Sequence, residues 1–462
     1  MIRIFKHYIP YPVLFLGVVD FCLLIVAAET AWVLRAHQID IHVGPMENRV
    51  GHLVTFAASV HYAAISVGVY GSDALQSLRF AIARLLVAVS LGVIFLSVLA
   101  FLFPGTTLWR SNSLYAMVLA FIFLGVSRVV LGSLLGGKSF KRRLLVLGAG
   151  RRAQRIKDLE TQPGAGFVAV GFIAFDEDKG IIPEAINRSA ILNLANFVVK
   201  LGTSEVVLAL EERRNALPVD DLLRIKTTGV HVYDISTFLE RETGRVDLES
   251  VNPSWLIFSD GFSSGRRLSG MAKRLFDIGA SAVLMLLSAP VILLFVILIK
   301  LESKGPAFYR QTRVGLYGQP YTVLKLRSMR TDAEQSGKAV WAQQDDARIT
   351  AVGKFIRKVR IDELPQTWNV LKGEMSFVGP RPERPEFVAD LERQLSFYAE
   401  RHMVKPGITG WAQINYPYGA SIEDSRHKLE YDLYYAKNYT PFLDILILLQ
   451  TIRVVLWPEG VR

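Results

Sequence analysis

The chain is 462 residues long, and hydrophobic residues make up 51% of it while charged residues make up only 21%. This balance is too apolar for an ordinary soluble enzyme and excludes a disordered or low-complexity scaffold. The formal charge is +11, from 53 Lys and Arg against 42 Asp and Glu. Such a surplus suits either nucleic acid or an anionic membrane surface. The single cysteine, Cys22, excludes an intramolecular disulfide and a multi-cysteine metal site.

Four apolar stretches in the first third of the chain are each long enough for a helix to cross the hydrocarbon core. They cover about 13–34, 53–70, 80–103 and 114–135. The first follows Arg3 and Lys6, as a signal peptide would. It is longer than the apolar part of a signal, and no small-residue cleavage site follows it, so we expect a retained span.

Basic residues near the ends of these stretches predict their orientation. With the N-terminus inside, the outer loops would hold only Arg35, Arg49 and Arg110. The cytoplasmic side would then hold the larger basic set, namely Arg3, Lys6, Arg79, Arg84, Lys138, Lys141, Arg142 and Arg143. The positive-inside bias therefore predicts that residues 1–138 form four transmembrane helices with both ends in the cytoplasm.

Four ionisable residues lie inside these stretches and allow two interpretations. Asp20, Glu29, His61 and Arg128 could mark a transport path, because charges within a membrane are costly. No stretch shows a repeated ionisable stripe, however. We therefore expect Glu29 and Arg128 to lie near helix ends and reach the interface, and Asp20 and His61 to face other helices.

The segment after the fourth stretch has the pattern of a soluble α/β domain. A short apolar run at 144–147 leads into Gly148-Ala149-Gly150 and then a helical pattern. Strand, glycine turn and helix in this order open a doubly wound nucleotide-binding fold. Further strands at 167–174, 205–210 and 230–235, with helices at 187–201 and 219–228, predict a Rossmann-like domain over 139–262.

The glycine turn has two interpretations. Gly148 and Gly150 could admit a dinucleotide or another phosphate at the helix N-terminus, or they could serve the turn alone. Ala153 replaces the third glycine of the dinucleotide pattern, and the nearest acidic residue for a ribose, Asp176, lies late. These departures favour the second interpretation.

A fifth apolar run, 275–299, differs from the other four because basic residues flank both ends and Ser288-Ala289-Pro290 lies in its middle. A complete span would carry the Lys- and Arg-rich remainder of the chain outside, against the positive-inside bias. A proline within a helix removes one backbone hydrogen bond and can bend the helix sharply. We therefore expect a re-entrant helix that breaks near Ser288 and Pro290; the alternative is a fifth, kinked span.

Two adjacent carboxylates, Asp362 and Glu363, precede a short helix predicted over 365–373. The helix N-terminus, with Arg357 and Arg360 nearby, would keep them ionised and attract phosphate. An ionised Asp there can attack phosphorus or hold a divalent cation, and the neighbouring Glu can supply the other role. Helix capping alone would also place acids here, but it does not explain the surrounding Arg and Lys clusters.

From about Ala272 to its end, the chain resembles the bacterial sugar transferase family, the polyprenyl-phosphate hexose-1-phosphate transferases. The resemblance rests on motifs in the family's order: Lys325-Leu326-Arg327-Ser328-Met329, Arg360-Ile361-Asp362-Glu363-Leu364-Pro365-Gln366, Asn369-Val370-Leu371-Lys372-Gly373, Gly379-Pro380-Arg381-Pro382-Glu383, Pro406-Gly407-Ile408-Thr409-Gly410-Trp411 and Tyr431-Asp432-Leu433-Tyr434-Tyr435. The front of the chain resembles the large members, which add four membrane helices and a Rossmann-like module. The implied fold is a mixed α and α/β membrane protein whose α-rich monotopic catalytic domain covers 271–462.

The resemblance also implies an activity. Members transfer hexose-1-phosphate from a UDP-sugar to undecaprenyl phosphate at the cytoplasmic face of the bacterial inner membrane and release UMP. This reaction starts exopolysaccharide or related glycan synthesis. Membrane lipid is then a further partner, nucleic acid is not expected, and a homodimer is left open.

Individual roles follow from the same resemblance. Asp362 would be the nucleophile that forms a phosphosugar–enzyme intermediate, Glu363 its catalytic partner, and Mg²⁺ would lie beside Asp362. Lys325 would support catalysis. The phosphate-binding residues would be Arg327, Arg357, Arg360 and Arg381. Members often have Ser directly before the proline of the re-entrant helix, whereas this chain has Ala289, with Ser288 one position earlier.

Two other functions are less well supported by the sequence. An NAD-dependent sugar-nucleotide epimerase or dehydratase would need a Tyr-x-x-x-Lys pair on a helix. Tyr321 and Lys325 have this spacing, but they lie in a strand-like pattern that would separate them by about 13 Å. A scaffold without activity would not need Asp362-Glu363 and its basic surroundings. The last apolar stretch, 442–456, is too short to cross a membrane and predicts an interfacial helix.

Overall fold

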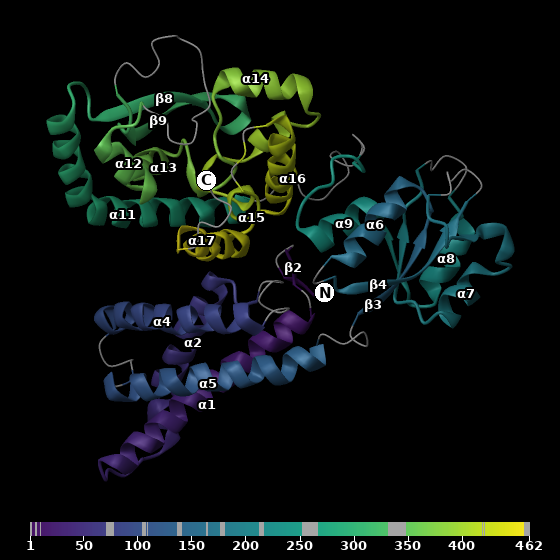
Figure 1. The fold of residues 1–462 in the computed structure, drawn as a ribbon, viewed down its shortest axis with the longest axis horizontal. Coiled ribbons are helices and arrows are strands. Elements are labelled where there is room, and N and C mark those ends of the chain that lie inside the picture. The colour runs from purple at the N-terminus through teal and green to yellow at the C-terminus, as the bar shows by residue number, and fades with distance from the viewer. Residues whose placement is uncertain are drawn as a thin grey trace. The chain divides into compact units, whose positions relative to one another are not determined.

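The computed structural model describes residues 2–4, 7–9, 11–70, 78–103, 108, 110–135, 141–162, 165–175, 181–211, 217–251, 267–330, 348–417, 419 and 421–456. The chain divides into two units, Met1–Ser250 and Val251–Arg462 (Figure 1). The first unit holds long apolar helices and a parallel sheet, and the second is mostly helical. This confirms the expected membrane protein with an α/β domain in its coarse form.

Four long apolar helices follow a short hairpin of β1 (Ile2–Ile4) and β2 (His7–Ile9). They are α1 (Tyr11–Gln38), α2 (Val50–Val67), α4 (Leu78–Leu102) and α5 (Arg110–Leu135), with the turn η1 (Met46–Arg49) before α2. Each contains a segment that is long and apolar enough to cross a membrane, as the sequence predicted. Buried side chains from all four helices, including Leu24, Phe56, Leu85 and Leu124, form one core.

The ionisable residues within these helices are paired, and this corrects part of the sequence interpretation. Arg128 does not reach the interface: it is buried, and its Nη1 and Nη2 donate to Asp20 Oδ1 and Oδ2 at 3.0 and 2.5 Å. The Tyr70 hydroxyl also donates to Asp20, at 2.9 Å, and lies 3.2 Å from His61 Nδ1. Asp20 and His61 thus face other helices, as predicted, and Asp20 compensates the charge that Arg128 would otherwise expose to lipid.

Glu29, which was expected to reach the interface, also has a charged partner within the protein. The Arg49 guanidinium, which precedes α2, donates its Nε proton to Glu29 Oε2 at 2.8 Å. Arg49 is itself buried and also binds the carbonyl oxygens of Val43 and Gly44. An ion pair between two segments satisfies both charges without help from lipid headgroups or water.

A five-stranded parallel sheet in the order β5-β4-β3-β6-β7 forms the α/β part of the first unit. Its strands are β3 (Arg142–Leu147), β4 (Phe167–Ala174), β5 (Ile186–Asn187), β6 (Glu205–Leu208) and β7 (His231–Asp234). The helices are α6 (Arg151–Thr161), α7 (Leu194–Lys200), α8 (Val219–Thr227) and α9 (Ile235–Thr243), with the turn η3 (Arg188–Ala190). This confirms the predicted doubly wound arrangement, although the helix expected from 187 begins only at Leu194.

Helices cover both faces of this sheet, with α6 and α9 on one face and α7 and α8 on the other (Figure 1). Leu144 and Val146 contact α6 and α9, whereas Leu145 and Leu147 contact α7 and α8. The run at 144–147 is therefore apolar throughout because both of its faces are covered. Asp176, considered as a ribose ligand, lies outside the described residues.

The second unit begins with the long helix α11 (Arg267–Glu302), which contains Pro290. Figure 1 shows α11 changing direction between a long first arm and a shorter second arm. The predicted break near Ser288 and Pro290 is thus a bend in one continuous helix. Proline removes only one backbone hydrogen bond, so the turns on either side can continue.

The remaining elements of the second unit pack around a two-stranded antiparallel sheet and a short parallel pair. The strands are β8 (Phe308–Val314), β9 (Pro320–Leu326), β10 (Ser376–Val378) and β11 (Gly407–Thr409). The helices are α12 (Ala351–Lys358), α13 (Gln366–Lys372), α14 (Pro385–Gln394), α15 (Trp411–Asn415), α16 (Ile422–Asn438) and α17 (Pro441–Leu456). The turns are η4 (Leu316–Gly318), η5 (Ile361–Glu363) and η6 (Ala399–Met403).

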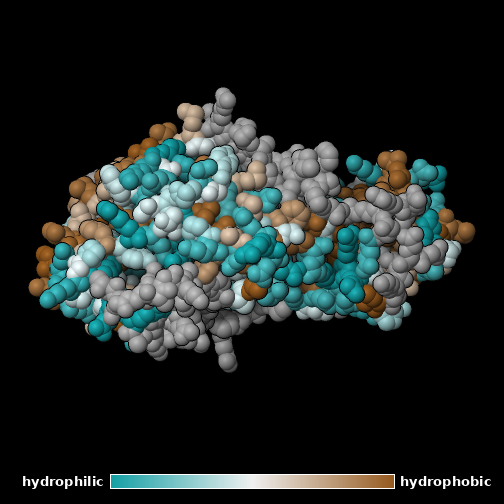
Figure 2. Space-filling model, turned by 90° about the horizontal axis from the view of Figure 1, so that it is seen from above, coloured by the Kyte–Doolittle hydropathy of each residue, from teal (hydrophilic) through white to brown (hydrophobic). Residues whose placement is uncertain are grey.

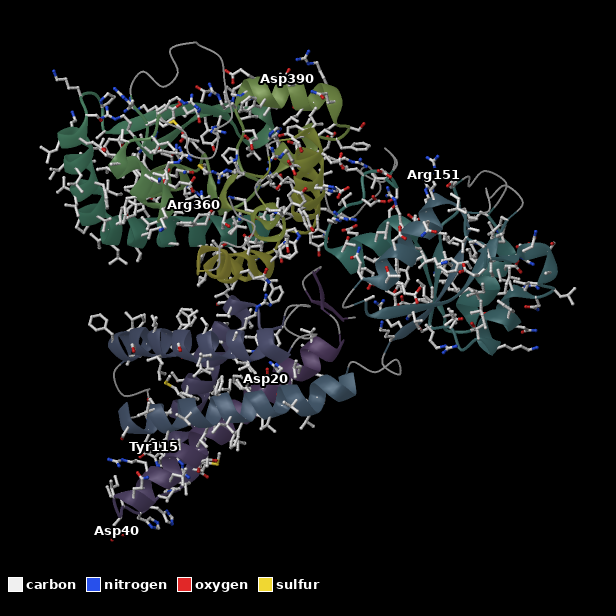
Figure 3. The ribbon with its side chains drawn as sticks, viewed as in Figure 1. Asp20, Asp40, Tyr115, Arg151, Arg360 and Asp390 are labelled. Carbon is white, nitrogen blue, oxygen red and sulfur yellow. The ribbon has the colours of Figure 1, made fainter. Side chains whose placement is uncertain are left out.

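The ion pair between Asp20 and Arg128 generates a stability prediction. Asp20→Asn leaves the buried guanidinium without its counter-charge, so it should destabilise the folded protein by on the order of 3 kcal/mol. Asp40→Asn is the matched control, because Asp40 is exposed near the end of α1 (Figure 3). Thermal unfolding in detergent measures both variants. Equal melting temperatures for Asp20→Asn and the wild type would contradict the prediction.

Candidate active site

Asp362 and Glu363 lie in the 3-10 turn η5, directly between α12 and α13. Arg360 precedes this turn with φ 59°, a left-handed conformation that side chains other than glycine seldom adopt, and it reverses the chain after α12. Pro365 occupies the N-cap of α13, and Gly373 ends the helix with φ 92°. The structure therefore confirms the short helix predicted over 365–373 and places both carboxylates just before its N-terminus.

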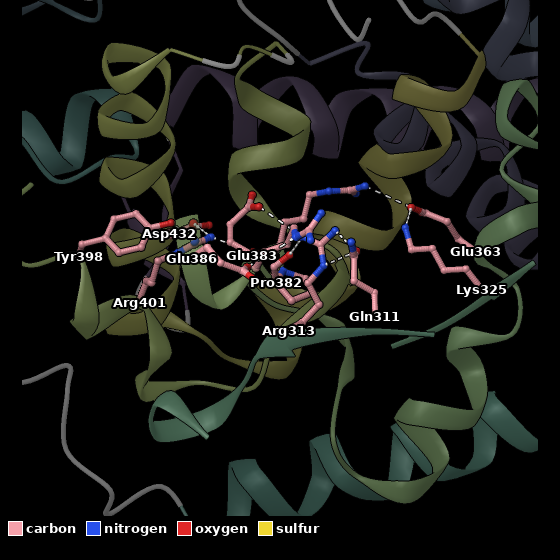
Figure 4. Close-up of polar contacts among 12 residues, drawn as sticks. Gln311, Arg313, Lys325, Glu363, Pro382, Glu383, Glu386, Tyr398, Arg401 and Asp432 are labelled. Atoms are coloured by element: carbon pink, nitrogen blue, oxygen red, sulfur yellow. Dashed lines mark hydrogen bonds and ion pairs between the residues drawn. The ribbon is translucent and has the colours of Figure 1, made fainter. Parts of the chain in front are cut away.

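Glu363 is the centre of a cluster of cations from β9, the loop at 379–383 and the start of its own turn. Lys325 Nζ, from β9, lies 2.9 Å from Glu363 Oε1, and Arg381 Nη2 lies 3.2 Å from the same oxygen (Figure 4). Arg360 Nη1 is 4.0 Å away. Burial acts to raise the pKa of Glu363, but the three cations outweigh burial and hold this pKa well below its usual range. Glu363 is thus a fixed anion.

Asp362 differs from its neighbour. Burial and the charge of Glu363 raise the pKa of Asp362, although Lys325, Arg360 and Arg357 act in the opposite direction. The cations thus stabilise the ionised form of Glu363, in line with the sequence prediction, whereas the pKa of Asp362 moves in the opposite direction. Within the described residues, Asp362 Oδ1 is buried and has no hydrogen-bond partner. This oxygen is available to a ligand or a reacting group.

The residues around Asp362 fit a magnesium ion only if the substrate supplies some of the ligands. No group of three or more His, Cys, Asp or Glu side chains that could hold a metal occurs in the described part of the chain. Mg²⁺ keeps several waters and commonly binds through one or two carboxylates together with substrate phosphates. The carboxylate of Asp362 suits such a site, in which a phosphorylated substrate completes the coordination.

Arg381 is held in place by its backbone. The Arg401 guanidinium donates to the Arg381 carbonyl oxygen at 2.9 Å and to the Asp432 carboxylate at 2.7 Å (Figure 4). The side chains of Arg401 and Asp432 are buried. Arg313 donates to the next carbonyl, that of Pro382, at 2.9 Å. These contacts fix the loop at 379–383 through its main chain and leave the Arg381 side chain to pair with Glu363.

A small pocket lies between β9, α13 and this loop. Its charged lining consists of Arg313, Lys325, Glu363 and Arg381. The rest of the lining is Val323, Gln366, Pro382, Gly407 and Ile408. Three cations against one anion give the pocket a net positive lining, which suits the phosphate groups of a substrate.

Two of the arginines assigned to phosphate have different positions. Arg327 is buried, and its Nη1 and Nη2 donate to the carbonyl oxygens of Lys304 and Ser303 at 3.0 and 2.8 Å. Arg327 therefore binds the C-terminal end of α11, and its buried guanidinium is engaged there instead of at a phosphate site. Arg357 lies half-buried near the end of α12, close enough to Asp362 to influence its charge.

The sequence interpretation missed Arg313 and the pair of Arg401 with Asp432. In the alternation of β8, Arg313 and Gln311 share a face, and Arg313 Nε donates to Gln311 Oε1 at 2.9 Å. That alternation was the available signal for Arg313. No local pattern links Arg401 to Asp432, because they lie on η6 and α16 and meet only in the folded unit.

The geometry at Gly148 and Gly150 supports the interpretation that these glycines are needed for the turn and not for phosphate binding. Gly148 has φ 130°, and a Cβ atom there would lie 2.6 Å from the Ala209 carbonyl oxygen. The first amide of α6, that of Arg151, donates to the Glu211 carboxylate at 2.7 Å. Beside Gly150, a carboxylate of the protein itself thus occupies the position that a phosphate takes in nucleotide-binding relatives of this fold.

Comparison with known proteins places the second unit in a described family. The sequence model of the family described as bacterial sugar transferase matches residues 268–458. A UDP-N-acetylgalactosamine-undecaprenyl-phosphate N-acetylgalactosaminephosphotransferase of Aeromonas hydrophila is 44% identical over 241 residues, 52% of this chain and 56% of that protein. The chain thus aligns with little more than half the length of that relative.

Two further relatives align over more of the chain. A UDP-glucose:undecaprenyl-phosphate glucose-1-phosphate transferase of Klebsiella pneumoniae is 35% identical over 322 residues, 68% of this chain and 67% of that protein. An undecaprenyl-phosphate glucose phosphotransferase of Komagataeibacter xylinus is 32% identical over 375 residues, 78% of this chain and 68% of that protein. Both alignments cover two thirds or more of the relative.

His402 generates a prediction about the pH dependence of stability. Burial, reinforced by Arg401, lowers the pKa of His402 to about 3. Between that value and the ordinary value of about 6.5, the unfolded chain binds a proton that the folded protein does not. Stability should therefore fall as the pH drops below about 6.5, by at most about 1.4 kcal/mol per pH unit from this residue.

The variant His402→Gln removes this titration. Its melting temperature should fall less steeply than that of the wild type between pH 7.5 and pH 5. His231→Gln, at an exposed histidine, is the control and should retain the steep fall. Parallel pH profiles for His402→Gln and the wild type would rule out His402 as a source of the acid sensitivity.

Proposed function

This chain belongs to the bacterial sugar transferase family, and from that premise we propose that it transfers hexose-1-phosphate from a UDP-sugar to undecaprenyl phosphate. The second product is UMP, and the lipid-linked sugar starts an exopolysaccharide or a related glycan. The names of the Klebsiella and Komagataeibacter relatives describe transfer to undecaprenyl phosphate. The observation that carries the proposal is the pairing of Glu363 with Lys325 and Arg381 beside the unpartnered oxygen of Asp362.

We assign the nucleophile to Asp362. Its carboxylate oxygen would attack the phosphorus that bears the sugar, and the bond from that phosphorus to the bridging oxygen would break, so that UMP leaves with the bonding electrons. The phosphosugar is then bound to Asp362. A phosphate oxygen of undecaprenyl phosphate would attack the same phosphorus, release the Asp362 carboxylate and form the lipid diphosphate sugar. Asp362 suits this role because its Oδ1 is not engaged in a hydrogen bond with the described residues.

Glu363 would take the complementary role. Its carboxylate is buried and paired with Lys325 and Arg381, so it holds two cations at the edge of the pocket. Cations fixed before the substrate arrives stabilise negative charge on the phosphates without reorganising during the reaction. Arg357 and Arg360 lie on the approach to Asp362 and would bind phosphate with Arg381. We propose that Asp362, together with the phosphorylated substrate, would hold Mg²⁺, and that the ion would supply positive charge for the departing phosphate.

We further propose that α11 is re-entrant. Three polar residues of its first arm contact other elements of the second unit. Lys273 Nζ lies 2.6 Å from Asp444 Oδ2, and Arg274 donates to the Val370 carbonyl at 2.7 Å. Asp277 accepts a hydrogen bond from Ser376 Oγ at 3.1 Å. The far end of α11 is bound by Arg327 of the same unit. Both ends of α11 are thus bound to the remaining elements of the same unit, as expected for a helix that enters and leaves the membrane by the same face.

Exposed apolar side chains support a membrane position for α11. The most exposed of them are Met271, Leu275, Leu286, Leu287 and Leu301. Figure 2 shows hydrophobic residues exposed along the left edge of the face that it draws. Placed at the cytoplasmic face of the bacterial inner membrane, α11 would hold the pocket where a soluble sugar nucleotide meets a lipid phosphate.

The proposed activity is tested by UMP release from a panel of UDP-sugars, with and without undecaprenyl phosphate. UDP-glucose, UDP-galactose and their N-acetylated counterparts form the panel. We expect UMP release with at least one of them, dependent on Mg²⁺ and independent of NAD. Asp362→Ala and Glu363→Ala should lower turnover by at least 1000-fold while retaining membrane insertion.

The control for these variants is Asp390→Asn, at an exposed aspartate of α14 (Figure 3). It should retain the turnover of the wild type. Wild-type turnover in Asp362→Ala or Glu363→Ala would refute the assigned pair, and a wild type without UMP release on any sugar would refute the activity.

The re-entrant helix is tested by topology. A reporter fused after Arg462 should read cytoplasmic, because α11 would return the chain to the face from which it entered. Fusions after Lys138 and after Arg462 should then agree. A periplasmic signal after Arg462, together with a cytoplasmic signal after Lys138, would establish a fifth span instead.

A further inference from the structure

The strand that carries Lys325 has one open edge. In the described part of the chain, β9 pairs with β8 and with no other strand. Backbone groups two residues apart point to the same side of a strand, so Thr322 and Leu324 present their polar groups together. Where such an edge is partly buried, its polar groups need hydrogen-bond partners outside the sheet.

Asn369 of α13 supplies those partners. Its Oδ1 accepts the Leu324 amide proton at 3.0 Å, and its Nδ2 donates to the Thr322 carbonyl oxygen at 2.7 Å. Its side-chain amide thus pairs with β9 as one residue of a neighbouring strand would. Asn369 is buried, and its Nδ2 also donates to Glu374 Oε2 at 2.7 Å. Both polar atoms of the side chain are therefore engaged.

These contacts define the register between β9 and the segment that carries the carboxylates. Asn369 follows Glu363 by six residues, through the turn η5 and the first turns of α13. Between the two hydrogen-bonded residues, Val323 packs on Val370, but an apolar contact alone permits sliding. The side-chain amide of Asn369 has one donor and one acceptor in fixed positions, and a shift of one residue would unpair both and turn Lys325 to the other face.

We propose that Asn369 is a positioning residue for the transfer reaction, holding β9 so that the Lys325 ammonium stays against Glu363. This inference rests on the proposed function, because it gives Asn369 its effect through Lys325. The 2.9 Å contact of Lys325 Nζ with Glu363 Oε1 is the geometry that Asn369 maintains. Loss of the side-chain amide leaves the cation less well placed for the charge that develops on the phosphates.

The test compares Asn369→Ala and Asn369→Gln with the wild type. Gln keeps both hydrogen-bonding groups but moves them by one methylene, so it folds even where Ala proves unstable. Each variant should lose at least tenfold in kcat per folded enzyme, while KM for the UDP-sugar stays within threefold. Glu374→Gln is the matched control, because it keeps an acceptor for Asn369 Nδ2, and it should retain the wild-type kcat.

A double-mutant cycle with Lys325→Met separates positioning from general stability. In that background, adding Asn369→Gln should change the residual rate of sugar transfer by less than twofold, because the cation is already absent. An equal loss in both backgrounds, or a wild-type kcat in Asn369→Gln, would overturn the role of Asn369. A wild type that releases no UMP would instead overturn the proposed function, so the two failures are distinguishable.

Discussion

The catalytic unit depends on the burial of one carboxylate, Glu363. An ionised carboxylate away from water is strongly unfavourable unless cations and hydrogen-bond donors compensate it. Here the compensation comes from two residues that are distant in the sequence, Lys325 of β9 and Arg381 of the loop at 379–383, and from Arg360, three residues before Glu363. The ion pairs that compensate the burial of the Glu363 charge therefore also hold cations at the pocket, and they do so without a bound substrate.

The surrounding structure holds those cations mainly through backbone contacts. Arg401, itself neutralised by Asp432, binds the Arg381 carbonyl, and Asn369 binds the edge of the strand that carries Lys325. Arg327 binds the end of α11 in the same way. Hydrogen bonds to the backbone fix the position of the Cα atom from which a cationic side chain extends. The charged ends of Lys325 and Arg381 therefore have little conformational freedom at the pocket. This arrangement suits a site that must neutralise phosphate groups from two substrates.

Charged residues in the first unit follow the same physical rule with a different outcome. Asp20 with Arg128 in the membrane helices, and Glu205 with Arg241 in the α/β domain, are buried pairs that satisfy each other. Glu211 likewise fills the helix N-terminus beside the glycine turn. These groups have found their partners within the protein. In the second unit, Asp362 Oδ1 is a buried carboxylate oxygen that has no hydrogen-bond partner among the described residues, and it lies next to the paired carboxylate of Glu363.

By itself, the sequence determined the features that depend on neighbours along the chain. The apolar stretches, the glycine turn at 148–150 and the short helix from Pro365 to Gly373 follow from periodicity and from local backbone preferences. Asp362 and Glu363 were found because they are adjacent in a recognisable motif. Only the tertiary structure decided which cation serves which group. Arg327 is two residues from Lys325 in the sequence but binds α11, and Arg128 pairs with Asp20 across the bundle. A buried charge takes the partner that long-range packing brings within reach, and no local pattern encodes that choice.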